Sequence, residues 1–544
     1  MLITDLLARN AARFGQETCL TEINLDLQDS HNVIWSEYEL IENNPAGEYR
    51  REMSWRVFDE KANRVANLLF KRGIGKGDKV AILLMNCLEW LPIYFGILKS
   101  GAVAVPFNFR YSATEIKYCL ELSDACALIF WPEFIGRIET IYGQIPKVKT
   151  MLFTGEGRPS FAESYDRLSA NCSSEAPLID IAERDDAAIY FSSGTTGFPK
   201  AILHSHKNLM AVARTEREHH GQTRNDCFLC IPPLYHTGAK MHWFGSLLAG
   251  SKAVLLRGIR PEWILRTISE EQVTIAFLLV PWAQDILDTI DRGDVKLSDY
   301  KLDQWRLMHI GAQPVPPSLI HRWKEHFPAQ QYDTNYGLSE SCGPGCVHLG
   351  TDNIRKVGAI GIPGYNWRVR IVDDTGEEVM PGKVGELAVK GDAIMRCYYH
   401  DPDATMAVLR DGWLLTGDMA RADEEGFIYL VDRKKDVIIS GGENIYPVEI
   451  EDFIRKHEAI KDAAVIGMPD VRLGEIAAAI IELKPGQICS FEEIATFCSQ
   501  LPRYKRPRQI FFDIVPRNPT GKIEKPKLRE KYGAAHLIED QMKD

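Results

Sequence analysis

The chain has no excess of basic residues and no long apolar run. Its 544 residues include 64 Lys and Arg against 75 Asp and Glu, which gives a formal net charge of −11. A nucleic-acid partner needs a basic surface that neutralises its phosphates, so we expect none. No uninterrupted apolar stretch approaches the ~18 residues that cross a bilayer, so we expect no membrane span. The charges of a substrate must therefore be met by local features of a site.

The start of the chain lacks the basic residues of a secretory leader, since residues 1–5 read Met-Leu-Ile-Thr-Asp. Apolar side chains over residues 2–14 recur at helical spacing, which predicts an amphipathic helix there. The 12 cysteines include Cys227 and Cys230, but no second pair stands at zinc-finger spacing. We therefore expect reduced, structural cysteines, a buried strand between these two, and a cytoplasmic protein.

Apolar and polar segments alternate along most of the chain. At 544 residues it is too long for one hydrophobic core, and roughly three or four structural units are expected. Helical and extended patterns alternate up to about residue 180, and again over about 185–360, which predicts parallel sheets with helices on both faces. The first predicted segments are a helix over 55–72, a strand over 79–85, a helix over 89–100 and a strand over 103–106.

The last third of the chain has a different pattern. Short apolar segments punctuated by Gly and Asp over about 359–430 predict a small barrel-like β unit. The remainder, residues 437–544, is predicted to form a separate α+β domain. Its predicted elements are a helix over 448–457 and strands over 463–468 and 477–483.

A hydroxyl- and glycine-rich stretch, Tyr190-Phe-Ser-Ser-Gly-Thr-Thr-Gly-Phe-Pro-Lys200, follows a short apolar run. Gly194 and Gly197 let consecutive backbone N–H groups turn toward an anion, and the ammonium of Lys200 adds a donor. The hydroxyl groups of this stretch belong to Ser192, Ser193, Thr195 and Thr196. We predict a phosphate-binding loop, with a plain polar turn between a strand and a helix as the alternative.

This stretch is not a Walker A loop. That motif places Gly directly before its lysine and Ser or Thr directly after it. Here Pro199 and Ala201 flank Lys200. P-loop kinases and GTPases are therefore disfavoured.

The loop resembles the signature loop of the adenylate-forming superfamily, which includes acyl-CoA synthetases, luciferases and the adenylation domains of peptide synthetases. Further motifs follow in the family's order. They are Tyr336-Gly-Leu-Ser-Glu340 for Y-G-x-T-E, Thr416-Gly-Asp418 for T-G-D, Asp432-Arg-Lys-Lys-Asp436 for the interdomain hinge, and Pro519-Thr-Gly-Lys522 for the catalytic lysine. The resemblance covers nearly the whole chain except residues 21–54.

The resemblance implies an α/β fold class with a large N-terminal and a small C-terminal domain. The N-terminal adenylation domain, residues 1–432, would contain two doubly wound α/β subdomains and a small β-barrel. Residues 433–436 would form the hinge, centred on Lys435, and residues 437–544 a mobile α+β domain. Relatives have a short hairpin where this chain has its polar stretch at 21–54, so an edge hairpin or a contact between chains is expected there.

The resemblance also implies ATP as a substrate and Mg²⁺ as a cofactor. Activation of a carboxylate by ATP brings two anions together, so neutralising charge is the main task, and Glu340 would hold the Mg²⁺. Tyr336 would stack on adenine, and Asp418 would accept the ribose hydroxyls. The nucleotide-binding set is Ser192, Ser193, Gly194, Thr195, Thr196, Gly197, Lys200, Gly311, Ala312, Gln313, Asn335, Tyr336, Gly337, Ser339, Asp418, Arg433 and Lys522.

The implied catalytic residues are Lys522, Glu340, Ser339 and His236. Pro and Gly before Lys522 fix a projecting loop that can aim its ammonium at a neighbouring domain. Ser339 stands where Thr is usual, and its hydroxyl keeps the contact implied for the α-phosphate. Tyr, Asp and Lys are individually more often structural or solvated, so these assignments depend on the register of the motifs.

The implied acyl pocket is His236, Lys240, Trp243, Trp282, Gly311 and Cys342. His236 lies in Pro232-Pro-Leu-Tyr-His-Thr-Gly238, which resembles the segment whose histidine stands between the carboxylate and the thiol channel. For both tryptophans a place in the core is the plainer alternative. Lys240 could pair with a polar group of the substrate, and a solvated lysine is the plainer alternative. Four further histidines are expected at the surface or in packing: His204, His206, His219 and His220.

Ser440-Gly-Gly-Glu-Asn444 resembles the loop that lines the pantetheine tunnel of CoA in relatives. The implied CoA-binding residues are Ser440, Gly441, Gly442, Arg472 and Lys505. We therefore predict an AMP-forming acyl-CoA synthetase for a hydrophobic aryl, alicyclic or medium-chain acid, with ATP, CoA and the acid as its partners and a homodimer left open. The alternatives are a ligase that loads a carrier protein, which the Gly441-Gly442 pair disfavours, and a catalytically inactive nucleotide-binding scaffold, which the intact motifs disfavour.

Overall fold

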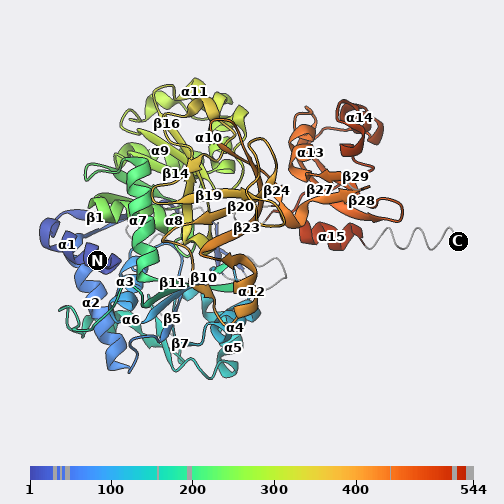
Figure 1. Cartoon of the computed structure of the whole chain (residues 1–544). Helices are drawn as coiled ribbons and strands as arrows, with labels where there is room; N and C mark the ends of the chain where they lie inside the picture. The colour runs from blue at the N-terminus through green and yellow to red at the C-terminus, as the bar shows by residue number, and fades with distance from the viewer. Residues whose placement is uncertain are drawn as a thin grey trace. The chain divides into compact units, whose positions relative to one another are not determined.

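The computed structural model describes residues 1–28, 33–36, 39–42, 49–155, 159–192, 199–441, 443–517 and 523–533. The chain divides into two compact units. The first contains residues 1–368 and 389–414, and the second contains residues 369–388 and those from 415 onward (Figure 1). The predicted division at residues 433–436 stays a prediction. Among the described residues no helix combines the length and apolarity needed to cross a membrane.

A nine-stranded sheet forms one half of the first unit, in the order β18-β17-β16-β15-β14-β12-β13-β1-β4. Its strands are β1 Thr18–Asn24, β4 Arg50–Ser54, β12 Cys227–Cys230, β13 Lys252–Arg257, β14 Ile275–Leu279, β15 Leu307–Gly311, β16 Gln331–Leu338, β17 Gly343–His348 and β18 Ile362–Pro363. The six central strands, β16, β15, β14, β12, β13 and β1, pair in parallel. The strands at the two edges pair antiparallel: β17 and β18 at one edge and β4 at the other. The buried strand predicted at Cys227 to Cys230 is confirmed as β12.

An eight-stranded sheet forms the other half, in the order β21-β11-β10-β6-β5-β7-β8-β9. Its strands are β5 Lys79–Leu83, β6 Val103–Pro106, β7 Ala125–Phe130, β8 Thr150–Phe153, β9 Glu163–Ser164, β10 Asp186–Ser192, β11 Lys200–Ser205 and β21 Cys397–Tyr398. The core on one face of this sheet contains residues of α4 and α5, and α2 and α3 lie on its other side (Figure 1). The predicted parallel sheets with helices on both faces are therefore present.

The helices of the first unit follow the predicted pattern closely. They are α1 Ile3–Phe14, α2 Trp55–Lys71, α3 Trp90–Lys99, α4 Ala113–Leu122, α5 Ile135–Ile141, α6 Tyr165–Ala170, α7 His206–His220, α8 Thr237–Ala249, α9 Pro261–Glu270, α10 Val280–Asp291, α11 Pro317–His326 and α12 Pro402–Val408. Every residue of α3 is buried, and so is nearly all of α8. These two helices contact each other through the rings of Phe95, Trp243 and Phe244. Their mainly apolar sequences are thus explained by burial on nearly all sides.

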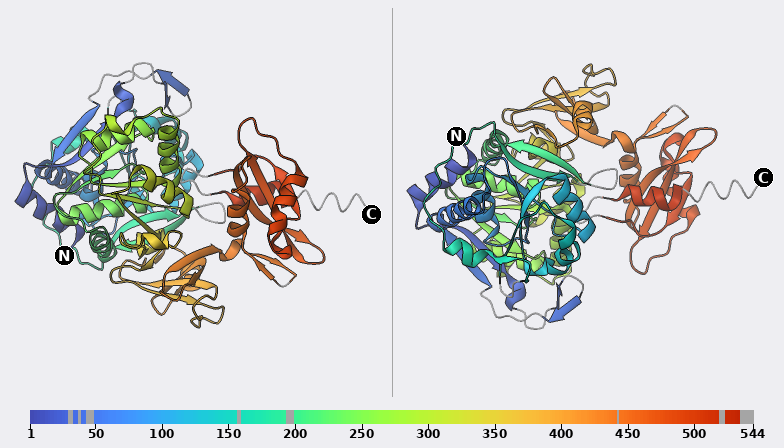
Figure 2. Two further views of the ribbon diagram at one scale, coloured as in Figure 1. Left: turned by 90° about the horizontal axis from the view of Figure 1, so that it is seen from above. Right: turned by 90° about the horizontal axis from the view of Figure 1, so that it is seen from below.

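The polar stretch from residue 21 to 54 contributes to a sheet edge. β1 and β4 pair antiparallel, and β4 is the outermost strand of the nine-stranded sheet. Between them β2 Val33–Ser36 and β3 Glu39–Glu42 form a separate two-stranded pair (Figure 2). An edge pairing was expected there and is confirmed. A contact between chains at this stretch stays a prediction.

The second unit begins with a small sheet in which β19, β20, β23 and β24 are neighbours in that order. Its strands are β19 Arg368–Val372, β20 Gly385–Lys390, β23 Trp413–Ala422 and β24 Ile428–Arg433. A second sheet follows in the order β26-β25-β28-β27, with β29 paired to β28. Its elements are β25 Ile438–Ser440, β26 Glu443–Ile445, α13 Pro447–Ile454, β27 Ile460–Asp470, β28 Gly474–Leu483, α14 Phe491–Phe497, β29 Gln509–Phe512 and α15 Lys525–Gly533.

Alternating side chains of β27 and β28 form two cores in the second unit. Val465 and Ile481 belong to the core that includes residues of α13 and α14. Their neighbours Ile466 and Ile480 belong to the core that includes Leu528 of α15. Because successive side chains of a strand point to opposite faces, a sheet that is apolar at every position must be covered on both sides. The α+β pattern predicted for this part of the chain is confirmed.

α2 and α3 pack closely against each other at Gly96. A Cβ built on Gly96 would lie 2.3 Å from the Cβ of Val65. Gly96→Ala should therefore push α2 from α3 and lower the free energy of unfolding by about 1–3 kcal/mol. Gly143→Ala is the matched control, because a Cβ there meets no atom of the described residues within 4 Å. Thermal unfolding midpoints check this, and equal midpoints for the two variants would contradict it.

Candidate active site

The predicted phosphate loop joins two neighbouring antiparallel strands. β10 and β11 pair so that Ser192 lies opposite Lys200 and Phe191 opposite Ala201. The loop therefore starts and ends at adjacent positions on one sheet, which holds both of its ends. Residues 193–198 of the loop lie outside the described part of the chain, and they include five of the predicted nucleotide-binding residues: Ser193, Gly194, Thr195, Thr196 and Gly197.

Glu340 lies in a single 3₁₀ turn, Ser339–Ser341, directly after β16. The hydroxyl of Ser341 accepts from the backbone N–H of Leu338 at 2.8 Å and donates to its carbonyl at 2.9 Å, which closes this turn. The carbonyl of Glu340 accepts a hydrogen bond from the N–H of Met395 at 2.7 Å. The turn is thus held at its start and through its own backbone, and its carboxylate has a defined position.

Tyr398 brings this carboxylate together with the lysine of the phosphate loop. Its hydroxyl donates to Oε1 of Glu340 at 2.8 Å, and Nζ of Lys200 lies 4.7 Å from the centre of its ring. Burial, with the charge of Glu340 second, raises the pKa of Tyr398, so its hydroxyl remains a donor at neutral pH. Sequence reasoning missed this tyrosine because no motif marks it; it lies on β21, which pairs with β11.

His204 supports the same turn from β11. Its Nε2 lies 2.8 Å from the carbonyl oxygen of Ser339, so Nε2 carries the proton and donates. Burial lowers the pKa of His204 to about 4, which keeps the imidazole neutral. Of the two outcomes expected for His204, surface or packing, the structure shows packing, and His206 and His220 are also buried.

Parallel pairing of β15 with β16 brings the predicted adenine-binding residues to one end of the sheet. Ile310 lies opposite Thr334, so Gly311 and Asn335 follow on adjacent strands. A Cβ on Gly311 would lie 3.7 Å from Oδ1 of Asn335. Ala312 turns away with φ +69°, while Tyr336 is buried at 7% exposure and Gly337 continues β16.

Two amide groups at this end of the sheet have unused hydrogen-bonding atoms. Among the described residues, neither Oε1 of Gln313 nor Nδ2 of Asn335 has a hydrogen-bond partner, although both atoms are buried. Buried polar atoms without a partner are uncommon in native proteins. One acceptor and one donor are therefore left for a ligand with both kinds of group, as the edge of a nucleobase has.

Lys240 is buried, which overturns the solvated interpretation. It has 0% exposure, and its Nζ donates to the carbonyl of Leu234 at 3.3 Å. Nζ also lies 4.1 Å from the ring centre of Tyr190 and 5.1 Å from that of Tyr94. Burial lowers the pKa of Lys240 to about 7. The ring faces attract a cation, and they offset part of the cost of removing it from water.

The other predicted pocket residues have different surroundings. His236 is the N-cap of α8, where its Nδ1 accepts from the N–H of Gly238 at 3.4 Å. Trp243 packs against Phe58 and Phe95 in the core, and Trp282 is half-buried in α10. Trp243 is therefore a core residue, as the plainer alternative had it, whereas Trp282 is not fully buried in the core. Cys342 is buried with its Sγ 3.9 Å from Sδ of Met241.

In the second unit, Asp418 and Arg433 lie opposite each other on β23 and β24. Nε of Arg433 is 3.0 Å from Oδ1 of Asp418. Gly417 has φ +72°, a backbone conformation that glycine adopts without strain. Lys435 follows in a short 3₁₀ turn, and burial is the main cause that lowers its pKa. The predicted ribose-binding pair is thus assembled within one sheet.

The predicted CoA-binding residues fall into two groups within the second unit. Ser440 pairs with Gly474, and the N–H of Gly441 donates to the carbonyl of Leu473 at 2.8 Å. Ser440 and Gly441 therefore lie beside the turn that carries the exposed Arg472. Nζ of Lys505 instead pairs with the carboxylate of Glu449 at 2.7 Å. Gly442 and Lys522 lie outside the described residues.

Comparisons with known proteins agree with this arrangement. Residues 35–399 match the family model of the AMP-binding enzyme, and residues 449–522 match that of the AMP-binding enzyme C-terminal domain. The long-chain-fatty-acid–CoA ligase FadD13 of Mycobacterium tuberculosis is 34% identical over 89% of this chain and 93% of its own length. A feruloyl-CoA synthase of Amycolatopsis is 32% identical over 88% of this chain and 94% of its own.

Solved structures give the same result for the fold. The anthranilate CoA ligase AuaEII in complex with anthranoyl-AMP superposes with a TM-score of 0.85 at 27% identity, over 99% of this chain and 98% of that one. The O-succinylbenzoate CoA synthetase of Bacillus subtilis in complex with AMP has a TM-score of 0.80 at 26% identity, over 96% and 98%. The predicted resemblance and fold class are confirmed, and the chain belongs to the AMP-binding enzyme family of the adenylate-forming superfamily.

Proposed function

We propose that this protein is an AMP-forming acyl-CoA synthetase. It joins a carboxylic acid to ATP as an acyl-adenylate with release of pyrophosphate, and then transfers the acyl group to CoA with release of AMP. The observation that carries the proposal is that Tyr398 contacts both Glu340 and Lys200. An anchored carboxylate and the ammonium of the residue that ends the phosphate loop therefore lie on one tyrosine. The CoA ligases among the relatives support it.

The first half-reaction requires a site that neutralises charge between two anions. Glu340 fits a Mg²⁺ ion, since its carboxylate is a hard oxygen donor and its second oxygen, Oε2, is left for the ion while Oε1 accepts from Tyr398. Bound Mg²⁺ would draw negative charge from the phosphate oxygens. Lys200 adds a cation beside the loop. Stacking of adenine on Tyr336 is supported by the unused amide atoms of Gln313 and Asn335.

Groups outside the first unit would complete this half-reaction. Asp418 would accept the ribose hydroxyls, with Arg433 holding its other side. Lys522 would stabilise the charge that develops as the acid attacks the α-phosphorus. In the proposed division, residues 1–432 form the adenylation domain and residues 437–544 the domain that carries Lys522.

The second half-reaction requires CoA to reach the adenylate without water. The C-terminal domain would turn about Lys435, withdraw Lys522 and present Gly441 and Gly442 as a wall of the pantetheine tunnel. Arg472 is exposed beside that loop and could meet a phosphate of CoA. Lys505 would do so only by exchanging its ion pair with Glu449.

The acid is proposed to be a hydrophobic aryl, alicyclic or medium-chain acid with a polar substituent. His236, which caps α8, would gate the passage between the carboxylate and the thiol. Lys240, four residues further along the same helix, would bind the polar substituent of the acid. It is a buried cation, and its only partners among the described residues are one carbonyl and aromatic ring faces. A cytoplasmic location and a homodimer remain parts of the proposal.

Product analysis tests the proposed function. Purified protein is incubated with ATP, Mg²⁺ and a panel of aryl, alicyclic and medium-chain acids, with and without CoA. The proposal expects AMP and pyrophosphate, with turnover that depends on CoA and a thioester as the product. Release of ADP and phosphate would contradict it, and turnover only with an unacylated carrier protein that bears a free phosphopantetheine thiol would favour the carrier-loading ligase.

Tyr398→Phe tests the anchoring of Glu340. The variant keeps the ring over Lys200 but loses the hydroxyl that positions the carboxylate, and loss of such outer partners typically costs 10–100-fold. We expect adenylation to fall by about that factor and to recover partly at higher Mg²⁺. Tyr399→Phe is the matched control, because its hydroxyl contacts Asp124 instead. Equal pyrophosphate-exchange rates for both variants would show that Tyr398 has no role in the active site.

The two half-reactions should fail separately in variants of the C-terminal domain. Lys522→Ala should lower acyl-adenylate formation by ~10²- to 10³-fold and still convert supplied acyl-adenylate and CoA to thioester. Gly442→Trp should do the reverse, since its side chain blocks the tunnel. Lys435→Pro should impair one half-reaction only, because the ring fixes φ in the hinge. Equal losses of both half-reactions in Lys522→Ala and Gly442→Trp would reject the alternation.

Lys240→Leu tests the substituent hypothesis. The variant should raise KM for the best polar-substituted acid and shift preference toward unsubstituted acids, whereas Lys207→Leu, which removes an exposed lysine, should not. In the wild type this preference should weaken from pH 6 to pH 9 as Lys240 loses its proton near its pKa of about 7.

Neighbouring groups do not titrate in that window. Burial raises the pKa of Cys230 and Cys342 and of the two tyrosines under Lys240, and it lowers that of His204 to about 4. An acid profile of Lys240→Leu that matches the wild type at both pH values would exclude this role.

A further inference from the structure

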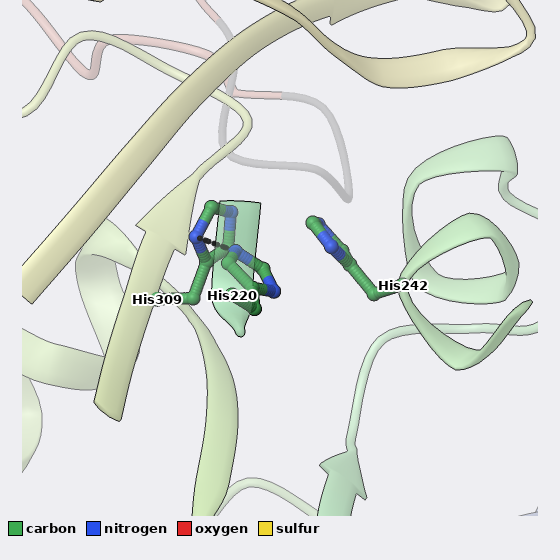
Figure 3. A group of neighbouring side chains, drawn as sticks. All are labelled: His220, His242 and His309. Carbon is green, nitrogen blue, oxygen red and sulfur yellow. Dashed lines mark hydrogen bonds between the residues drawn. The ribbon is translucent and has the colours of Figure 1, made fainter. Parts of the chain in front are cut away.

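Six ionisable side chains meet in the interior of the first unit, apart from the residues assigned to the reaction. They are Glu216 and His220 of α7, His242 of α8, His309 of β15, Asp333 of β16 and His348 of β17. All six side chains are 0% exposed. Figure 3 shows His220, His242 and His309, which come from three different elements, with nitrogens of His220 and His309 facing each other.

This cluster has more polar atoms than partners. Among the described residues, no hydrogen-bond partner exists for Oε1 of Glu216, Nδ1 of His220 or Nε2 of His309. The same holds for Nε2 of both His242 and His348. Two carboxylates buried together also repel each other. Burial opposes a charge on His348, but Asp333 and Glu216 raise the pKa of its ring to about 9, so a proton there supplies part of the counter-charge. A divalent cation would balance the two carboxylates while leaving every imidazole neutral.

Four of the six distances between the proposed ligand atoms are close to those of a tetrahedral site, whereas the rings of His309 and His348, whose centres lie 6.5 Å apart, would have to approach each other when the ion binds. Nε2 of His220, Nδ1 of His309 and Oδ2 of Asp333 form a triangle with sides of 3.1, 3.3 and 3.7 Å. Nδ1 of His348 lies 3.3 Å from the same Asp333 oxygen. A tetrahedral ion with bonds of ~2.0–2.1 Å separates its ligand atoms by roughly 3.3–3.4 Å. We propose that His220, His309, His348 and Asp333 bind one Zn²⁺ ion.

Glu216 supplies the outer partner that such a site needs. Its Oε2 lies 2.6 Å from Nδ1 of His242 and 3.7 Å from Nδ1 of His220. Its Oε1 lies 3.6 Å from Nε2 of His348. The nitrogens of His220 and His348 that face away from Asp333 therefore face this carboxylate. A carboxylate in that position orients a ligating imidazole and fixes which nitrogen is free to bind the metal.

The ion would have a structural role. Four protein ligands leave no position for water or substrate, as in closed zinc sites. The ligands tie α7 to three neighbouring strands, β15, β16 and β17. His309 and Asp333 precede Gly311 and Asn335 by two residues on their strands, so the ion would brace the end of the sheet that holds the nucleotide.

Metal content of the full chain tests the proposal without reference to activity. Protein stripped with a chelator is reconstituted with Zn²⁺ in excess Mg²⁺, desalted and analysed by plasma mass spectrometry, and about one Zn²⁺ per chain is expected. His309→Phe and Asp333→Asn should retain less than about a tenth of that amount. His326→Phe is the matched control, since it removes a partly exposed histidine that pairs with Asp291, and it should keep the full amount.

Cobalt substitution decides the case even where a variant does not fold. Wild-type protein reconstituted with Co²⁺ should show the intense visible bands of a tetrahedral site, and added Zn²⁺ should abolish them. Wild type that retains no more Zn²⁺ than His309→Phe, or that shows only the weak bands of octahedral Co²⁺, overturns the proposal. The cluster would then be a metal-free network of buried hydrogen bonds.

Discussion

The antiparallel pairing of β10 with β11 is the interaction on which the rest of the site depends. It puts Ser192 opposite Lys200 and so holds both ends of the phosphate loop on adjacent strands. The other edge of β11 pairs with β21, which carries Tyr398 to the carboxylate of Glu340. β11, β21 and the turn of Glu340 are far apart in the sequence. They meet through the pairing of β11 with β21 and through the hydrogen bonds that Met395 and Tyr398 donate to Glu340, which fix the position of its carboxylate.

Burial of charge is the second constraint, and the chain meets it in different ways. Lys99 is buried beside the Asp59 carboxylate at 2.6 Å, which is the ordinary solution. Lys240 has no carboxylate partner among the described residues and lies against ring faces, so burial lowers its pKa toward neutrality. A group in that condition is able to respond to the charge of a bound molecule. The proposed zinc cluster is a third solution, in which a metal replaces protons as the counter-charge.

Much of the fold and the identity of the motifs could be predicted from the sequence. Apolar periodicity located α1 and β12, and the motif register identified Glu340, which directly follows β16, and Asp418, which lies within β23. Such features are local, because a few consecutive residues determine where a strand ends or what a loop contains. The resemblance also placed Asp418 and Arg433 in one nucleotide-binding set, and the structure adds that Nε of Arg433 lies 3.0 Å from Oδ1 of Asp418.

Contacts between distant segments could not be predicted in the same way. For Lys240 the sequence left a solvated lysine as the plainer alternative to a pocket residue, because its neighbours in sequence do not show that α8 is buried on nearly all sides. Tyr398 carries no motif, and its role arises only from the strand beside it. The four proposed zinc ligands, His220, His309, Asp333 and His348, share no short spacing. Their proximity is created by the adjacent strands β15, β16 and β17, of which β17 is antiparallel to β16, together with α7.

Isotope transfer tests the central claim, that the carboxylate attacks the α-phosphorus in this site. An acid labelled with a heavy oxygen isotope in its carboxylate is converted with ATP, Mg²⁺ and CoA, and the AMP produced is analysed by mass spectrometry. Attack on the α-phosphorus followed by thiol attack on the acyl carbon leaves one carboxylate oxygen on AMP. The account predicts labelled AMP and unlabelled pyrophosphate. Unlabelled AMP, or label in phosphate released with ADP, would contradict it.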